Sequence, residues 1–139
     1  WGPMRVQCDA ERGTRRIVLP NGLHLIYDTL ERYRDDEGDE YWRLKTRKGW
    51  AKLYGAKLVE NVIQALARVV VSQAMIRLKH RGYRCICTKH DSLWLLIPKD
   101  DGRLEEHKAT IISEMSVTPS WLPGIPLAAE FKTIGERYG

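Results

Sequence analysis

KLYGAKLVENVIQALARVVVSQAMIRLKHR, residues 52–81, is the longest regular segment of the chain and decides the fold. Apolar residues recur in it at steps of three and four, the spacing of side chains on one face of an α-helix. The members of this apolar stripe are Val59, Ile63, Leu66, Val70, Ala74 and Leu78. Gly82 follows and favours the end of a helix. We therefore expect a helix over residues 52–81 that buries the stripe.

A second face of this helix is polar. Its members, again three or four residues apart, are Lys57, Asn61, Gln64 and Arg68. Such a row is typical of a solvated helix surface. It also suits sequence-independent binding of duplex DNA, because Asn and Gln can donate to minor-groove acceptors that all base pairs share, and Lys and Arg meet phosphates. The residues alone leave both interpretations open.

Short β-prone segments precede the helix. Residues 17–27 hold two such runs around Pro20-Asn21-Gly22, a combination that favours a hairpin turn. Residues 41–46 alternate enough to return as a third strand.

Two more strands are expected after the helix, over residues 83–89 and 93–97. His90-Asp91-Ser92 lies between them, which places Asp91 at the exposed turn of a buried hairpin. Turns often carry Asp for local backbone bonding, so a purely structural turn is the alternative. Residues 127–131 are expected to form a further strand. Together the elements predict an α+β fold, an antiparallel sheet with a long helix packed on one face.

Length and composition favour a single intracellular globular domain over residues 1–139. A chain of this length has room for one core, and 43% hydrophobic and 29% charged residues match soluble proteins. No run approaches the roughly 20 apolar residues of a membrane span, and three cysteines, an odd number, favour reduced thiols. The net charge of +5 favours a polyanionic partner.

Two segments in register resemble a known family. Residues 54–68, YGAKLVENVIQALAR, are similar to the long palm helix of phage-type family A DNA polymerases. His90-Asp91-Ser92, with the apolar strand after it, resembles the third polymerase motif of that family, usually written His-Asp-Glu. Residues 121–127 and the closing Glu136-Arg137-Tyr138-Gly139 look like its C-terminal tail.

The resemblance covers roughly residues 17–139 and implies a C-terminal palm subdomain with a palm-like sheet. Residues 1–50 would be a β-rich lead-in, and residues 51–139 would carry the palm helix, the motif-three hairpin and the tail.

The resemblance also implies roles for single residues. Asp91 matches a carboxylate that binds catalytic Mg²⁺, and His90 would lie beside it against the primer-terminal nucleotide. Two such ions stabilise the attacking 3′-hydroxyl and the leaving pyrophosphate. Gln64 matches the helix glutamine that contacts the primer–template minor groove, and the neighbouring face holds Asn61, Arg68 and Lys57.

Two departures from the family pattern shape the functional expectation. Ser92 stands where the family usually has Glu, which removes an acidic group near the metal site. The sequence also has no Asp-Tyr/Phe-Ser-x-Ile-Glu string, the first motif with the second aspartate, and no fingers helix to hold the incoming triphosphate. A single carboxylate loop cannot hold two ions, so we expect no polymerisation by this chain alone.

The sequence thus predicts the C-terminal part of a DNA-directed DNA polymerase, a nucleotidyltransferase of DNA replication in the cytoplasm of a phage-infected cell. Its expected partners are an upstream polymerase chain carrying motifs one and two, which shares the Mg²⁺ site, together with primer–template DNA and deoxynucleoside triphosphates, and no membrane. The sequence leaves open whether the chain is one part of a naturally split polymerase or a fragment of a longer one. Exposed tryptophans would favour such a partner chain, namely Trp42, Trp50, Trp94 and Trp121. The alternative is a non-catalytic nucleic-acid-binding module derived from a polymerase palm, which Ser92 and the missing first motif favour.

Overall fold

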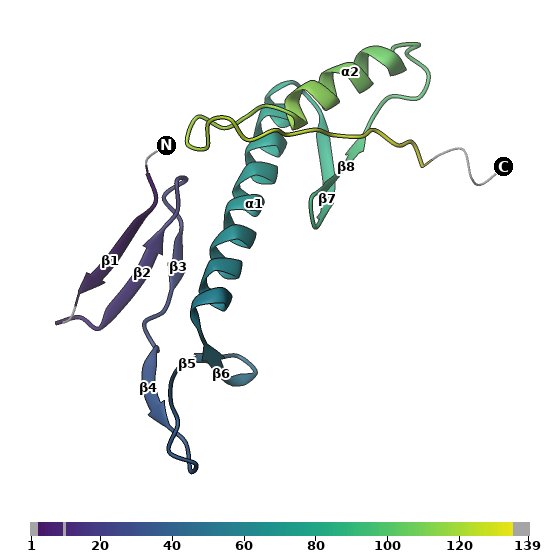
Figure 1. Ribbon diagram of the computed structural model, residues 1–139. Coiled ribbons are helices and arrows are strands. Elements are labelled where there is room, and N and C mark those ends of the chain that lie inside the picture. Colours follow the sequence, from purple (N-terminus) through teal and green to yellow (C-terminus); the bar gives the residue numbers. More distant parts are fainter. Residues whose placement is uncertain (1–2, 10, 135–139) are drawn as a thin grey trace. The chain divides into compact units, whose positions relative to one another are not determined.

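The computed structural model describes residues 3–9 and 11–134, and its elements are shown in Figure 1. It confirms the α+β class, with one long helix and three small antiparallel sheets. The chain divides into two compact units, of which the first ends at Leu66 and the second begins at Ala67. This boundary lies inside the long helix, whereas the sequence suggested a change of character at residue 50. The single domain over residues 1–139 stays a prediction.

The first sheet contains β1 (Arg5–Asp9), β2 (Thr14–Val18) and β3 (His24–Ile26) in that order. The predicted hairpin is confirmed, since β2 pairs antiparallel with β3. Its turn is closed by a hydrogen bond of 2.7 Å from Leu19 N to Leu23 O, and Gly22 adopts a positive φ of 81°. The buried residues of this part of the chain include Ile17, Val18, Leu19, Pro20 and Tyr27. Strand β1 was not predicted.

The second sheet contains β4 (Glu31–Arg34), β5 (Glu40–Thr46) and β6 (Gly49–Leu53) in that order. The strand expected over residues 41–46 is confirmed as β5. It pairs with β4 and β6 and therefore belongs to a sheet of its own, separate from the first hairpin.

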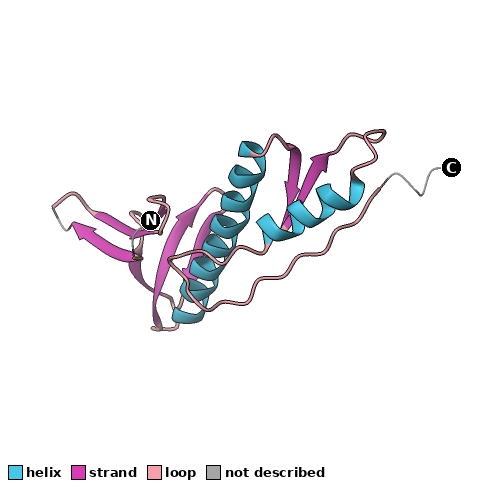
Figure 2. Ribbon diagram, turned by 90° about the horizontal axis from the view of Figure 1, so that it is seen from above, coloured by secondary structure: helices cyan, strands magenta, loops and turns pink. Residues whose placement is uncertain are grey.

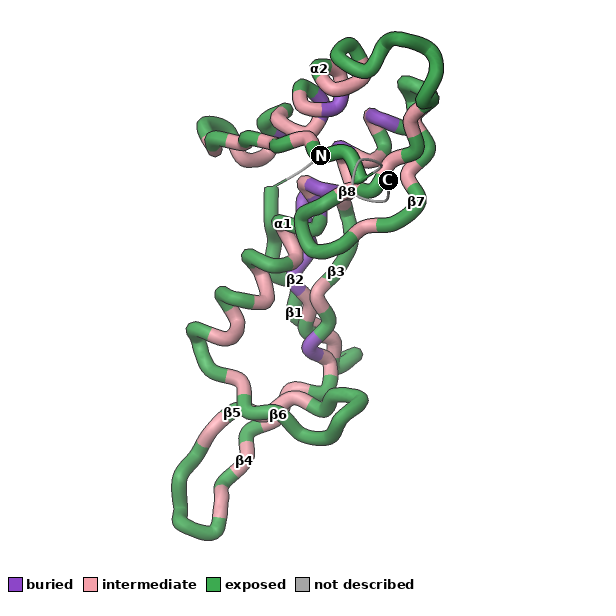
Figure 3. The backbone as a smooth tube through the Cα atoms, turned by 90° about the vertical axis from the view of Figure 1, so that its right-hand side faces the viewer, coloured by how far each residue is buried: buried purple, intermediate pink, exposed green. Residues whose placement is uncertain are grey.

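Helix α1 (Gly55–His80) begins three residues later than expected, because Lys52 and Leu53 pair with β5 as part of β6. Ala74 and Leu78 of the predicted stripe are buried, as Figure 3 shows for this end of the helix. The first half of the stripe was wrong, since Val59 and Ile63 are 56% and 59% exposed.

The length and composition of α1 would also allow it to cross a membrane, contrary to the expectation that no segment is apolar enough; core helices of soluble proteins pass the same test. Glu60 and Arg68 lie within this helix, and charged residues are rare inside membrane spans.

The second unit combines the C-terminal half of α1 with the hairpin of β7 (Arg84–Lys89) and β8 (Ser92–Leu96) and with α2 (Leu104–Met115). Figure 2 shows the hairpin and α2 beside this half of α1. The two helices are joined by Glu114, which is 7% exposed and accepts hydrogen bonds from Arg77 Nε at 3.1 Å and Arg81 Nε at 2.5 Å.

The second unit differs from two of the predictions. Both hairpin strands are confirmed, but the hairpin is not buried, since Ile86, Trp94 and Leu96 are 53%, 40% and 50% exposed. Residues 127–131 form no strand, which corrects that prediction. Alanine has low β-propensity, and this segment pairs with no strand in the described part of the chain. The predicted tail residues 136–139 lie outside the described part of the chain.

Candidate metal and nucleic-acid site

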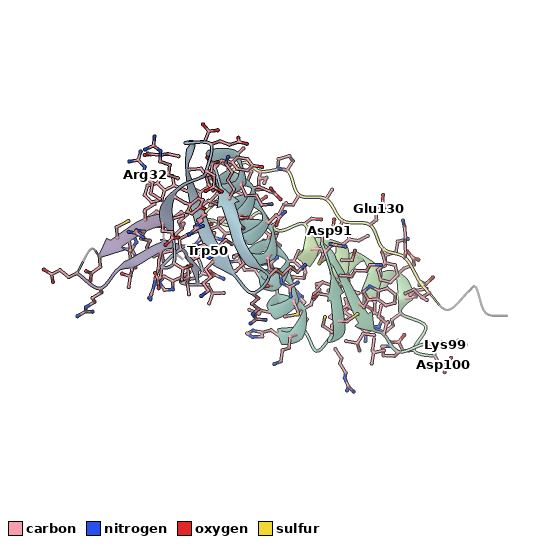
Figure 4. The ribbon with its side chains drawn as sticks, turned by 90° about the horizontal axis from the view of Figure 1, so that it is seen from below. Arg32, Trp50, Asp91, Lys99, Asp100 and Glu130 are labelled. Atoms are coloured by element: carbon pink, nitrogen blue, oxygen red, sulfur yellow. The ribbon has the colours of Figure 1, made fainter. Side chains whose placement is uncertain are left out.

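Asp91 lies at the tip of the β7–β8 hairpin, where the sequence placed it (Figure 4). Lys89 pairs with Ser92, so His90 and Asp91 form a two-residue turn, and both are exposed. His90 has a φ of 53° and is the one non-glycine residue with positive φ in the described part. Tight two-residue hairpin turns require positive φ, and His tolerates it better than most residues. The turn therefore presents both side chains to solvent.

A bulge in β7 precedes this turn. The pairing shifts between Cys85 and Cys87, so one extra residue lies on β7 opposite β8. Bulges bend a strand and redirect the side chains that follow, and they are common beside functional sites.

The residues around Asp91 do not by themselves form a metal site. Its carboxylate forms no ion pair in the described part of the chain, and its Oδ1 lies 3.5 Å from Ser92 Oγ. No group of three His, Cys, Asp or Glu side chains gathers anywhere in residues 3–9 and 11–134. Mg²⁺ prefers octahedral coordination by several hard oxygens. Asp91 supplies one such ligand, and a pair of ions would need carboxylates from elsewhere.

Of the four α1 residues predicted to bind DNA, Arg68 lies in the same unit as Asp91 and His90. Its Nη1 donates a hydrogen bond of 3.0 Å to Thr88 Oγ1 on β7. This bond fixes α1 to the strand that leads into the turn. A guanidinium has five donors, so the bond to Thr88 leaves others for a phosphate.

The other three predicted residues lie in the first unit, on the half of α1 that faces β3 and β5. Asn61 and Gln64 line an open groove of about 420 Å³ whose other walls are Leu25, Ile26, Tyr27, Leu44 and Ala65. Asn61 Nδ2 donates to Tyr27 Oη at 3.4 Å. The structure thus brings Asn61 and Gln64 together at a groove with a polar and an apolar side.

Glu60 binds the side chains of Lys57 and Gln64 on this face of α1. It accepts hydrogen bonds from Lys57 Nζ at 2.9 Å and from Gln64 Nε2 at 3.0 Å. The hydrogen bond and the charge of Glu60 raise the pKa of Lys57 above its usual value. A phosphate would have to compete with this carboxylate for Lys57.

Sequence reasoning missed three partners of the predicted residues, namely Glu60, Tyr27 and Thr88. Glu60 was open to prediction, because it stands three residues after Lys57 and four before Gln64, the spacings at which helical side chains meet. Tyr27 and Thr88 lie on other elements, and no local pattern points to them.

Comparison with known proteins gives one relevant similarity. No family model matches the chain, and no solved structure matches it. A DNA polymerase of Bacillus phage SP02 is 32% identical over 127 residues, which is 86% of this chain and 19% of that protein. The chain therefore spans about a fifth of the length of the relative that it matches, and the similarity relates it to a segment of a phage DNA polymerase.

Proposed function

We propose that this chain is the C-terminal palm portion of a phage-type family A DNA polymerase and that Asp91 serves its nucleotidyl-transfer site. The observation that carries the proposal is the place of Asp91, exposed in the tight turn of a hairpin whose first strand is bonded to α1 through Arg68. The similarity to a phage DNA polymerase supports the same class of protein. The setting would be the cytoplasm of a phage-infected cell.

Asp91 would act as one ligand in a site that other residues complete. The turn gives its carboxylate an open approach, and no described cation competes for it by an ion pair. When bound, Mg²⁺ would supply charge stabilisation for phosphoryl transfer. Because no group of three His, Cys, Asp or Glu side chains gathers in the described residues, we propose that an upstream polymerase chain contributes the second carboxylate and that deoxynucleoside triphosphates bind only to the assembled site.

The polar residues of α1 would hold the primer–template duplex. Gln64 and Asn61 carry amide donors suited to the minor-groove acceptors, while Lys57 and Arg68 carry the charges for phosphates. His90, exposed beside Asp91, would meet the primer end. These contacts would fix the DNA without selecting its sequence.

A reconstituted complex tests the proposal. The chain would be co-expressed with an upstream polymerase chain, purified by a tag on this chain alone, and assayed for primer extension with Mg²⁺. Asp91→Asn should abolish extension while circular dichroism and duplex binding stay at the parental level, because an exposed amide replaces an exposed carboxylate of equal size. Asp100→Asn, a matched change at an exposed loop residue after β8, should leave extension unchanged.

Extension by Asp91→Asn near the parental rate would exclude this residue as a metal ligand. Robust extension by the unpartnered chain would refute the shared site.

The second candidate is a non-catalytic nucleic-acid-binding module. It is favoured by the lack of a three-ligand cluster in the described residues and by Ser92 in place of an acidic residue. In that case the purified complex would bind primer–template DNA through the α1 residues, and no chain added to it would confer extension.

A further inference from the structure

The second sheet carries an unbroken row of stacked aromatic and cationic side chains. Lys52 Nζ lies 4.3 Å from the ring centre of Tyr41, and the Tyr41 and Tyr33 rings are 5.6 Å apart. The Arg43 guanidinium lies 3.6 Å from the Tyr33 ring centre and 4.3 Å from that of Trp50. Five side chains from three strands therefore contact one another in a continuous row, with Trp50 at one end.

Strand register places this row on one face of the sheet. Arg43 pairs with Glu31 on β4 and with Lys52 on β6, and Lys45 pairs with Trp50. Directly paired residues share a face, so this face also holds Lys45 and Glu31. Leu44, on the other face, lines the groove beside α1. The row therefore faces away from that groove.

The face has an excess of positive charge. Arg43, Lys45 and Lys52 stand against one carboxylate, Glu31, which accepts a hydrogen bond of 2.7 Å from Arg43 Nε. Arg47 and Lys48 follow in the exposed β5–β6 turn. Arg43 is held by Glu31 and two rings, and Lys52 lies over the Tyr41 ring, whereas Lys45, Arg47 and Lys48 form no ion pair among the described residues.

We propose that this face binds an unpaired strand of DNA. Trp50 is 47% exposed at the end of the row and would stack on a base (Figure 4). Lys45, Lys52 and the β5–β6 turn would meet the phosphates. Aromatic platforms next to a basic track bind single strands with little sequence preference, because every base has a π-face. The choice of DNA over other single strands rests on the proposed polymerase function.

A purely structural row would explain the stacking but not the arrangement at its end. Arg43 already links Tyr33 and Trp50, whereas the lysine opposite Trp50 and the two cations of the turn form no ion pair among the described residues. Like charges close together disfavour one another unless an anion is bound. An exposed indole beside this unpaired positive charge is the combination that a base and its phosphate fit.

The sheet provides its own control residues. Trp42 is 45% exposed and pairs with Arg32, so both lie on the opposite face. Anisotropy of a fluorescein-labelled 20-mer of dT would be measured with the whole chain and with Trp50→Leu, Trp50→Phe and Trp42→Leu. Trp50→Leu should weaken binding about tenfold, in keeping with the loss of one stacked base. Trp50→Phe, which keeps a ring, and Trp42→Leu should each change it less than about threefold.

Two variants that each remove one positive charge keep the test decisive if Trp50→Leu unfolds the sheet. Lys45→Gln should lower the slope of log affinity against log salt by about 0.7, the value for one phosphate of a single strand. Arg32→Gln, the same charge change on the opposite face, should leave the slope unchanged. Equal effects of the two changes, or equal effects of Trp50→Leu and Trp42→Leu in folded protein, would overturn the proposal.

The outcome is separable from that of the proposed function. Loss of extension in Asp91→Asn with no selective effect at Trp50 or Lys45 would reject this face alone. Selective effects at Trp50 and Lys45, with extension retained by Asp91→Asn, would reject the proposed role of Asp91 alone.

Discussion

Arg68 on α1 donates a 3.0 Å hydrogen bond to Thr88 on β7, three residues before Asp91. The residue expected to meet a DNA phosphate is thus bonded to the strand that carries the expected metal ligand. A DNA strand that rests against Arg68 would therefore be held at a fixed position along the same hairpin.

Replacing Arg68 should weaken DNA binding without regard to sequence. Arg68→Ala removes one phosphate contact, so the affinity for duplex primer–template should fall almost uniformly and the salt slope should drop by about one unit. Fluorescence anisotropy at several salt concentrations measures both. Thr88→Val is the control, since it removes the bond to β7 but keeps the charge, and it should preserve the slope. If alanine at Asn61, Gln64 and Arg68 together left duplex binding at the parental level, the polar face would be ordinary surface.

Removing the charge of Glu60 should strengthen duplex binding. Glu60→Gln frees Lys57 from its ion pair and removes an anion that repels phosphates. We therefore expect the affinity for duplex DNA to rise about threefold at low salt and to depend more steeply on salt concentration. Glu105→Gln, the same charge change at an exposed position of α2, should have a smaller effect. Unchanged affinity in Glu60→Gln would mean that DNA does not approach this part of α1.

Glu114 should be important for the stability of the second unit. Glu114→Ala removes the buried carboxylate that Arg77 and Arg81 share and leaves the partly buried Arg77 without this acceptor, so the free energy of unfolding should fall by about 2 kcal/mol. Urea unfolding followed by circular dichroism would show it. Glu105→Ala breaks the exposed pair with Lys108 and should cost less than about 0.5 kcal/mol. Equal losses in the two variants would contradict a special role for Glu114.

The start of α2 should lose stability in acid through Asp101. His107 Nε2 lies 2.8 Å from Asp101 Oδ2, and this hydrogen bond, followed by that from the Arg103 amide, lowers the pKa of Asp101. A carboxyl with a lowered pKa stabilises the fold above its unfolded pKa, near 3.9, and the contribution disappears as the pH falls through the folded value.

Unfolding measured between about pH 5 and pH 2 should therefore depend less on pH in Asp101→Asn than in the parent. Asp100→Asn, its exposed neighbour, should retain the parental pH dependence. A parental pH profile in Asp101→Asn would contradict the assignment.

The sequence predicted those elements whose structure is determined by residues close together along the chain. The 14–26 hairpin follows from its Pro-Asn-Gly turn, and α1 follows from its long apolar period. Strands β1 and β4 were missed because Arg5–Asp9 and Glu31–Arg34 are rich in charged residues and are held by pairing with a neighbouring strand. Residues 127–131 show the converse, a β-like run without a paired strand.

The sequence predicted only those features of the site that lie within one segment of the chain. The hairpin turn with Asp91 follows from the two strands around it, whereas the bond from Arg68 to Thr88 and the groove beside Tyr27 depend on which elements meet. Burial was the property predicted least well, because Val59 and Ile63 match the helical period but no described element covers them. Periodicity identifies an apolar face and does not identify what lies against it.

The narrowness of the three sheets has a consequence for amide hydrogen exchange. Each has only two or three strands, so both of its outer strands leave a row of backbone amides without a partner strand in the described part of the chain. These amides should exchange with deuterated water much faster than those of the second half of α1. An added strand would slow them on one edge only, so the pattern of protection measured with the proposed partner chain present would show which edge that chain occupies.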